Sequence, residues 1–152
     1  MGSDMPKITR SSLVTHKPEQ MFDLVNDFSQ YPQFLPWCAN ARVIKCSDNE
    51  IIGELTISKG ALQQAFTTRN ACSRPSRIDL SLVKGPFKSL GGHWLFEPIG
   101  HDACRVSLEL EFEFSNRLIA VAIGVVFSQI VGSLVEAFCD RADTLYGEPF
   151  ER

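Results

Sequence analysis

The sequence is poor in the residues that build metal sites and disulfide frameworks, and their spacing suits neither. Its five cysteines are an odd number without a Cys-x-x-Cys pair, and its three histidines have no cysteine or carboxylate at ligand spacing. These residues are Cys38, Cys46, Cys72, Cys104 and Cys139, and His16, His93 and His101. We therefore expect no structural disulfide, no metal site and a cytoplasmic location, where thiols stay reduced.

Catalytic signatures are also missing from the sequence. It contains no Ser-His-Asp nucleophile elbow, no phosphate-binding glycine loop and no dinucleotide fingerprint. Glu109, Glu111 and Glu113 form a run of carboxylates, but their alternate spacing places all three on the outer face of one strand, opposite Leu110 and Phe112. We expect a solvated edge rather than an acid–base pair, and hence no catalytic residue, no required cofactor and no enzymatic activity.

No secretion signal is expected either, because residues 1–10 contain no apolar stretch. The 152 residues with a net charge of −3 are enough for one domain with its own core. We place this domain at residues 5–147, with short tails at 1–4 and 148–152. The overall acidity argues against DNA as a partner.

Charge is nevertheless unevenly distributed, because residues 59–88 carry six basic side chains against the single acidic Asp79. The six are Lys59, Arg69, Arg74, Arg77, Lys84 and Lys88. They fit a local patch that neutralises phosphates on a large partner, or a set of scattered, solvated charges on the outer face of a sheet. The residue pattern leaves both interpretations open.

The pattern from Ala39 to Phe114 predicts an antiparallel sheet of about six or seven strands, bounded by glycine and proline turns. Its clearest strand runs from Val106 to Phe114, where apolar and polar residues alternate. Before it, residues 7–14 predict a first strand, and Pro18 begins a helix that reaches about Asp27. We expect the strand that contains Trp94, at 93–96, to be ended by Pro98 and a turn at Gly100.

One long helix is predicted from Arg117 to Tyr146, with Asn116 as its N-cap and Gly147 and Pro149 at its end. Its second half is amphipathic, whereas residues 118–127 are apolar all round. The 18 uncharged residues between Arg117 and Glu136 are near the lower limit for a membrane span, but the sheet needs a cover. We expect a pocket wall or a partner surface here and no integral insertion, while peripheral contact with a membrane stays open.

Several strings stand in a specific order along the chain. They are YPQFLP at 31–36, FTTRN at 66–70, GPFK at 85–88, GGHWLF at 91–96 and FEF at 112–114, followed by the apolar helix. In this order they resemble the coenzyme Q-binding branch of the START-like superfamily, which also contains polyketide cyclases, and within it the bacterial ribosome association toxins. The resemblance covers essentially residues 5–146.

The resemblance implies an α+β helix-grip fold, in which a curved antiparallel sheet wraps around the C-terminal helix and leaves a tunnel. It also implies ubiquinone or another polyprenyl lipid as the ligand. For the toxin branch it implies binding to the large ribosomal subunit and a block of subunit association. A cyclase activity, which the fold would also allow, lacks a pocket-facing acid or base.

Large apolar side chains of the predicted strands and helix are the candidate lining of the tunnel. They are Phe66, Leu80, Leu82, Trp94, Phe96, Leu110, Phe112, Phe127, Ile130 and Leu134. Thr68, Arg69 or His93 could orient a ligand head group. The segment 32–37, which ends in Trp37, is either a rigid corner or a tunnel lip.

Overall fold

The computed structural model describes residues 6–60 and 62–147 and has one sheet, one long helix and three short helical segments. The predicted tails at 1–4 and 148–152, and the helix-stopping Pro149, lie outside these residues. The strands are β1 (Lys7–Val14), β2 (Cys38–Ser47), β3 (Glu50–Lys59), β4 (Leu62–Ser73), β5 (Arg77–Lys84), β6 (Phe87–Ile99) and β7 (Ala103–Phe114). The helices are α1 (Pro18–Asn26), the 3₁₀ turn η1 (Phe28–Gln30), α2 (Tyr31–Phe34) and α3 (Arg117–Tyr146).

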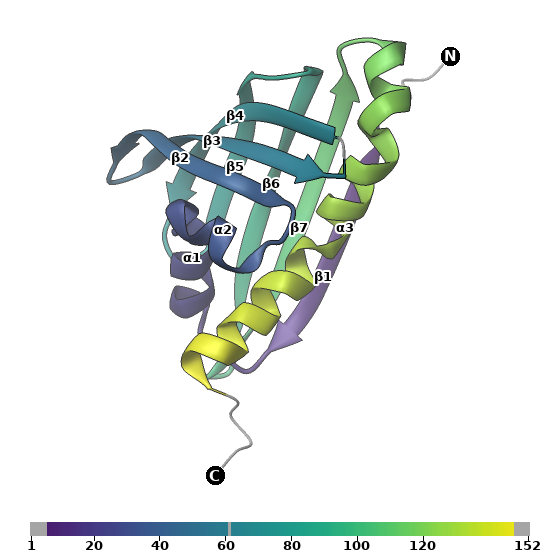
Figure 1. Ribbon diagram of the computed structural model, residues 1–152. Coiled ribbons are helices and arrows are strands. Elements are labelled where there is room, and N and C mark those ends of the chain that lie inside the picture. The colour runs from purple at the N-terminus through teal and green to yellow at the C-terminus, as the bar shows by residue number, and fades with distance from the viewer. Residues whose placement is uncertain (1–5, 61, 148–152) are drawn as a thin grey trace.

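The seven strands form one antiparallel sheet in the order β1-β7-β6-β5-β4-β3-β2. Figure 1 shows that this sheet curls and that α3 lies across its concave side, with α1 and α2 near the C-terminal end of α3. Only the first strand leaves the sequential order, because β1 pairs with β7 rather than with β2. The α+β helix-grip fold is therefore confirmed.

The long helix begins and covers the sheet as its sequence predicts. The Asn116 side chain accepts a hydrogen bond from the amide of Ile119 at 2.9 Å, which satisfies one of the free N–H groups of the first turn. Phe127, Val131 and Phe138 are buried against the strands. By length and composition α3 could cross a membrane, but this apolar face is part of the core of the domain.

Strand alternation separates the two faces of β7. Leu110 and Phe112 point inward and are buried, whereas Glu109, Glu111 and Glu113 point outward. Two of the outer carboxylates form exposed ion pairs with neighbouring strands, at 3.8 Å from Lys7 to Glu109 and 3.9 Å from Lys88 to Glu113. The prediction that this carboxylate run lies on the solvent side of the sheet is confirmed.

The strand that contains Trp94 ends directly before the expected Gly100 turn, but Pro98 does not interrupt it. Strand β6 continues through Pro98 to Ile99, which pairs with Ala103 of β7. Its other neighbour, β5, has its last pair at Leu95, so β6 is an edge strand beyond that point. A proline is tolerated there because its missing N–H removes no bond from a central ladder.

Candidate functional site

An apolar cavity lies between the concave face of the sheet and α3. Its volume is about 80 Å³, and its lining comes from α1, η1, α2, strands β3 to β7 and the middle of α3. Seven of the predicted ligand residues line it. They are Phe66, Leu80, Trp94, Leu110, Phe127, Ile130 and Leu134. The structure thus brings most of the predicted lining together, and their role in binding stays a prediction.

The three remaining predicted residues do not border this cavity. Phe96 is buried against Phe22, with the two ring centroids 5.9 Å apart. Phe112 borders an outer groove, and Leu82 is a half-buried residue that packs on the edge of the core. Period-two alternation correctly assigns all three to the inner face, but it does not show how far along each strand the cavity extends.

Two polar side chains interrupt the apolar lining. Thr68 and Asn70 are both buried on the inner face of β4, and the Thr68 hydroxyl donates a hydrogen bond to Asn70 Oδ1 at 2.9 Å. Nearby on β4, the Cys72 thiol donates to Asn26 Oδ1 at 3.2 Å. A few fixed polar groups in an apolar cavity are what orients a ligand head group.

Two of the three residues expected to contact a head group lie elsewhere. Arg69 points to the convex face, where its Nε is 2.9 Å from a carboxylate oxygen of Glu50. His93 pairs in register with Asp79, which lies on that same outer face. Both expectations are wrong because side chains next to an inward residue along a strand must point outward. Only Thr68 reaches the cavity.

The segment after the first strand contributes to the lining of the cavity, which agrees with a tunnel lip at 32–37 but was not predicted for Phe28 and Tyr31. Phe28 packs so closely on β3 that a Cβ atom at Gly53 would lie 2.6 Å from its ring. Tyr31 donates its hydroxyl proton to the carbonyl oxygen of Val25 at 2.6 Å, and burial raises the pKa of the phenol. Trp37 also lines the cavity, so the aromatic loop contributes directly to its wall.

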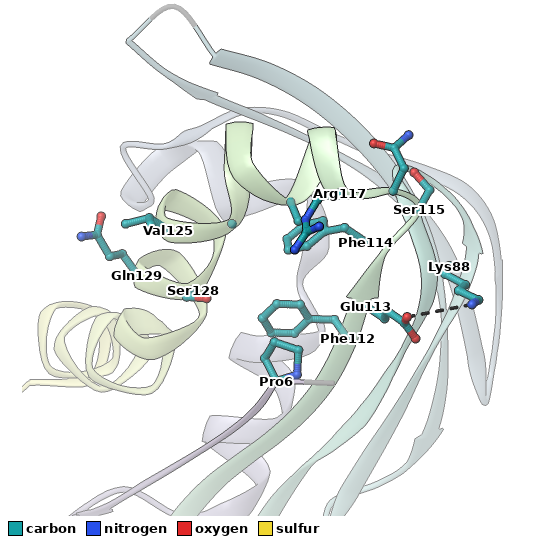
Figure 2. A pocket seen from close by; sticks show the side chains of 13 residues that line it. Pro6, Lys88, Phe112, Glu113, Phe114, Ser115, Arg117, Val125, Ser128 and Gln129 are labelled. Carbon is teal, nitrogen blue, oxygen red and sulfur yellow. Dashed lines mark ion pairs between the residues drawn. The ribbon is translucent and has the colours of Figure 1, made fainter. Parts of the chain in front are cut away.

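A second, open groove lies between the N-terminal half of α3 and the end of β7 (Figure 2). Its volume is about 840 Å³. Phe112 and Phe114 of β7 border it on one side, and Val125 of α3 borders it on the other. Lys88 and Arg117 also line it, so the groove combines an apolar wall with two cationic side chains.

A cluster of phenylalanine rings separates the groove from the inner cavity. Phe127 lines the cavity, and its ring centroid lies 4.8 Å from that of Phe112 and 5.9 Å from that of Phe114, which both line the groove. Phe66 and Phe87 complete the cluster, at 6.0 and 5.0 Å from Phe127. Three of these contacts are edge-to-face and the contact with Phe87 is tilted, and together they stabilise a layer of rings between the two spaces.

The basic residues of 59–88 are mostly neutralised within the domain. Four of the six form ion pairs with carboxylates, and these pairs are Arg69–Glu50, Arg74–Asp23, Arg77–Asp79 and Lys88–Glu113. Within residues 6–60 and 62–147, Lys59 and Lys84 form no such pair. A phosphate contact by this segment stays a prediction, and it would depend most on these two lysines.

The buried cysteines are poorly suited to act as nucleophiles. Burial raises the pKa of the Cys38, Cys104 and Cys139 thiols to about 11, so at neutral pH they are protonated and weakly nucleophilic. Over the described part of the chain, no group of three or more His, Cys, Asp or Glu side chains is arranged to hold a metal ion.

These features define a helix-grip domain with an apolar cavity under its long helix. The model of the family described as polyketide cyclase / dehydrase and lipid transport matches residues 14–139, and the chain belongs to this family. Among solved structures, the 18 kDa protein CC1736 from Caulobacter crescentus is 32% identical, with a TM-score of 0.73 and coverage of 94% of this chain and 99% of that one. The Zhui aromatase/cyclase from Streptomyces sp. R1128, with a TM-score of 0.79 at 11% identity, covers 91% and 94% and supports the fold alone.

Curated relatives extend over nearly the whole chain. The ribosome association toxin RatA of Vibrio cholerae is 43% identical over 144 residues, covering 95% of this chain and 100% of the relative. The persistence and stress-resistance toxin PasT of Escherichia coli is 44% identical over 142 residues, covering 93% and 90%. The mitochondrial coenzyme Q-binding protein COQ10 homolog B of Xenopus laevis is more distant, at 26% identity, covering 97% of this chain and 62% of the relative.

Proposed function

We propose that this protein associates with the ribosome, where it binds the large subunit and prevents subunit joining. The observation that carries the proposal is the 43% identity to RatA of Vibrio cholerae over the full length of that relative. The matched region includes every helix and strand of the fold. The activity requires no catalytic residue, because steric occupation of a subunit interface is sufficient.

The ends of two strands offer charge for such a contact, because Lys59 is the last residue of β3 and Lys84 the last residue of β5. Among the described residues these two lysines have no ion-pair partner, so they are able to neutralise phosphates without first losing a carboxylate. The other four basic residues would first have to leave their carboxylate partners, so a phosphate contact gives each of them less binding free energy than it gives an unpaired lysine. We therefore place the main electrostatic contribution on these two lysines.

Overexpression is expected to increase free ribosomal subunits in sucrose gradients, with the protein migrating alongside the large subunit. The double variant Lys59→Glu/Lys84→Glu should associate more weakly. The slope of the logarithm of the association constant against the logarithm of salt concentration should fall in magnitude by about two, or roughly one for each lost phosphate contact. Lys45→Glu/Arg105→Glu, with the same charge change outside the 59–88 segment, is the matched control. An unchanged gradient profile with no protein on the subunits would refute the ribosomal role.

A second function is supported by the cavity itself. Its apolar lining carries the buried Thr68–Asn70 pair, which can donate a hydrogen bond to a ligand carbonyl. We propose that it accommodates the head group of a polyprenyl quinone, in line with the name of the COQ10 relative. The present volume of about 80 Å³ is below the several hundred Å³ of most ligand pockets, so uptake requires the phenylalanine cluster to move.

Protein purified from a quinone-producing host is expected to carry quinone that native mass spectrometry and solvent extraction detect. The double variant Thr68→Val/Asn70→Leu removes donor and acceptor together, so no buried polar group is left unpaired and the fold should be kept. Its quinone content should fall about tenfold, equivalent to one good hydrogen bond. Equal loading of the variant and the wild type would show that the pair does not bind the head group.

A further inference from the structure

The N-terminal half of α3 presents an exposed apolar stripe. Leu118, Val121 and Val125 are 80%, 77% and 70% exposed, and their spacing of three and four residues places them on one side of the helix. Only 28% of the apolar 18-residue stretch of α3 is buried. A helix that served the core alone would bury most of this stretch, so this side of α3 has no partner within the described residues.

Charge along α3 is strongly polarised around this stripe. Residues 118–135 contain no charged side chain, and Arg117 immediately precedes them. Acidic residues occur only in the second half of the helix, beginning at Glu136. The stripe is therefore bordered by Arg117, while Lys88 across the groove is paired with Glu113 at 3.9 Å and the acidic end of the helix lies several turns away.

A second copy of this chain is a poor occupant for the stripe. Its three exposed side chains offer on the order of 400 Å², about half of what each partner contributes to a stable interface. The stripe is also purely aliphatic, whereas protein interfaces are anchored by Tyr, Trp and Arg in fitted pockets. A lipid bilayer needs no such fit, because aliphatic side chains only have to enter the acyl region.

We propose that the N-terminal half of α3 docks this protein on an anionic lipid bilayer. The helix lies parallel to the surface with Leu118, Val121 and Val125 in the acyl boundary, at the depth of about 5–10 Å that suits one helical face. Arg117 contacts a lipid phosphate, whereas Lys88 would first have to leave Glu113, and the groove bordered by Phe112 and Phe114 opens near the membrane. This surface is separate from Lys59 and Lys84, so it does not depend on the ribosomal proposal.

Vesicle flotation tests the proposal with the full chain. The wild type is expected to float with vesicles of phosphatidylcholine mixed with phosphatidylglycerol, and less with phosphatidylcholine alone. Val121→Glu/Val125→Glu should lower the partition coefficient at least about tenfold, because two carboxylates must then enter the acyl boundary. Leu13→Glu/Val83→Glu changes two exposed apolar residues of the sheet, which are 62% and 44% exposed, and should float like the wild type.

Three results would overturn the proposal. The wild type could remain unbound on both kinds of vesicle, or the α3 variant could float as well as the wild type. Light scattering could instead show a stable dimer that Val121→Glu/Val125→Glu dissociates, which would assign the stripe to a second copy. Circular dichroism should be unchanged in the variant since both valines are exposed, and its ribosome gradient should match that of the wild type.

Discussion

Gly92→Ala is expected to unfold the protein or to lower its free energy of unfolding by about 4 kcal/mol or more. Strand β6 approaches β7 so closely at Gly92 that a Cβ atom would overlap the carbonyl oxygen of Glu109. It would also lie 2.9 Å from the Cα atom of Leu110. Both obstacles are backbone atoms, so no side-chain rotation can relieve the overlap and the two strands must separate.

The neighbouring glycine provides a matched control for this change. A Cβ atom at Gly91 would lie 3.4 Å from the carbonyl oxygen of Leu80 and would meet nothing closer. Gly91→Ala should therefore be near neutral, or stabilise by about 0.5 kcal/mol through the lower entropy of the unfolded chain. Urea unfolding of both variants measures the difference, and equal stabilities would contradict the close approach of β6 and β7.

The overall fold could be predicted because its two strongest signals are local. The first strand and the long helix begin and end at the predicted residues 7–14 and 117–146. In the helix, Asn116 and Gly147 are capping residues with a direct physical role, and no proline intervenes. The turn at Gly100 ends β6 as predicted, but Pro98 was wrongly expected to interrupt the strand, because its tolerance depends on where β5 stops, which is a property of the sheet and not of the local sequence.

The site was less predictable because cavities depend on distances across the fold. Alternation along a strand correctly predicts that Leu110 points inward and that its neighbours point outward. The same rule predicts that His93 points outward, because it is next to the inward Trp94. It could not show that Phe28 and Tyr31 line the cavity, since their positions depend on packing against β3 and α3. The ion pairs of the basic residues could not be predicted either, because their carboxylate partners are brought close only by the fold.

The proposed quinone cavity and the proposed membrane-docking surface lie on either side of the phenylalanine cluster. The inner cavity is lined by the buried polar pair Thr68 and Asn70, while the groove lies next to the exposed stripe of α3. Phe127 lies between the two spaces. A lipid that entered from a membrane would have to displace this ring before its head group reached Asn70, so Phe127 is expected to limit uptake.

Phe127→Ala should lower the free energy of unfolding by about 3–5 kcal/mol, because a ring that is 3% exposed and contacts four other phenylalanines is lost. The same change removes the wall between cavity and groove. Uptake of a short-chain quinone such as decylubiquinone should therefore increase, despite the lower stability. Urea unfolding and native mass spectrometry at a temperature where the variant is folded measure the two effects.

Phe22→Ala is the matched control, since Phe22 is equally buried and borders neither the cavity nor the groove. It should cost a similar free energy of unfolding through the loss of its contact with Phe96, without any gain in quinone uptake. Comparable uptake by the two variants would mean that looser packing alone admits the ligand. In that case Phe127 would be an ordinary core residue, and the route from groove to cavity would have to be abandoned.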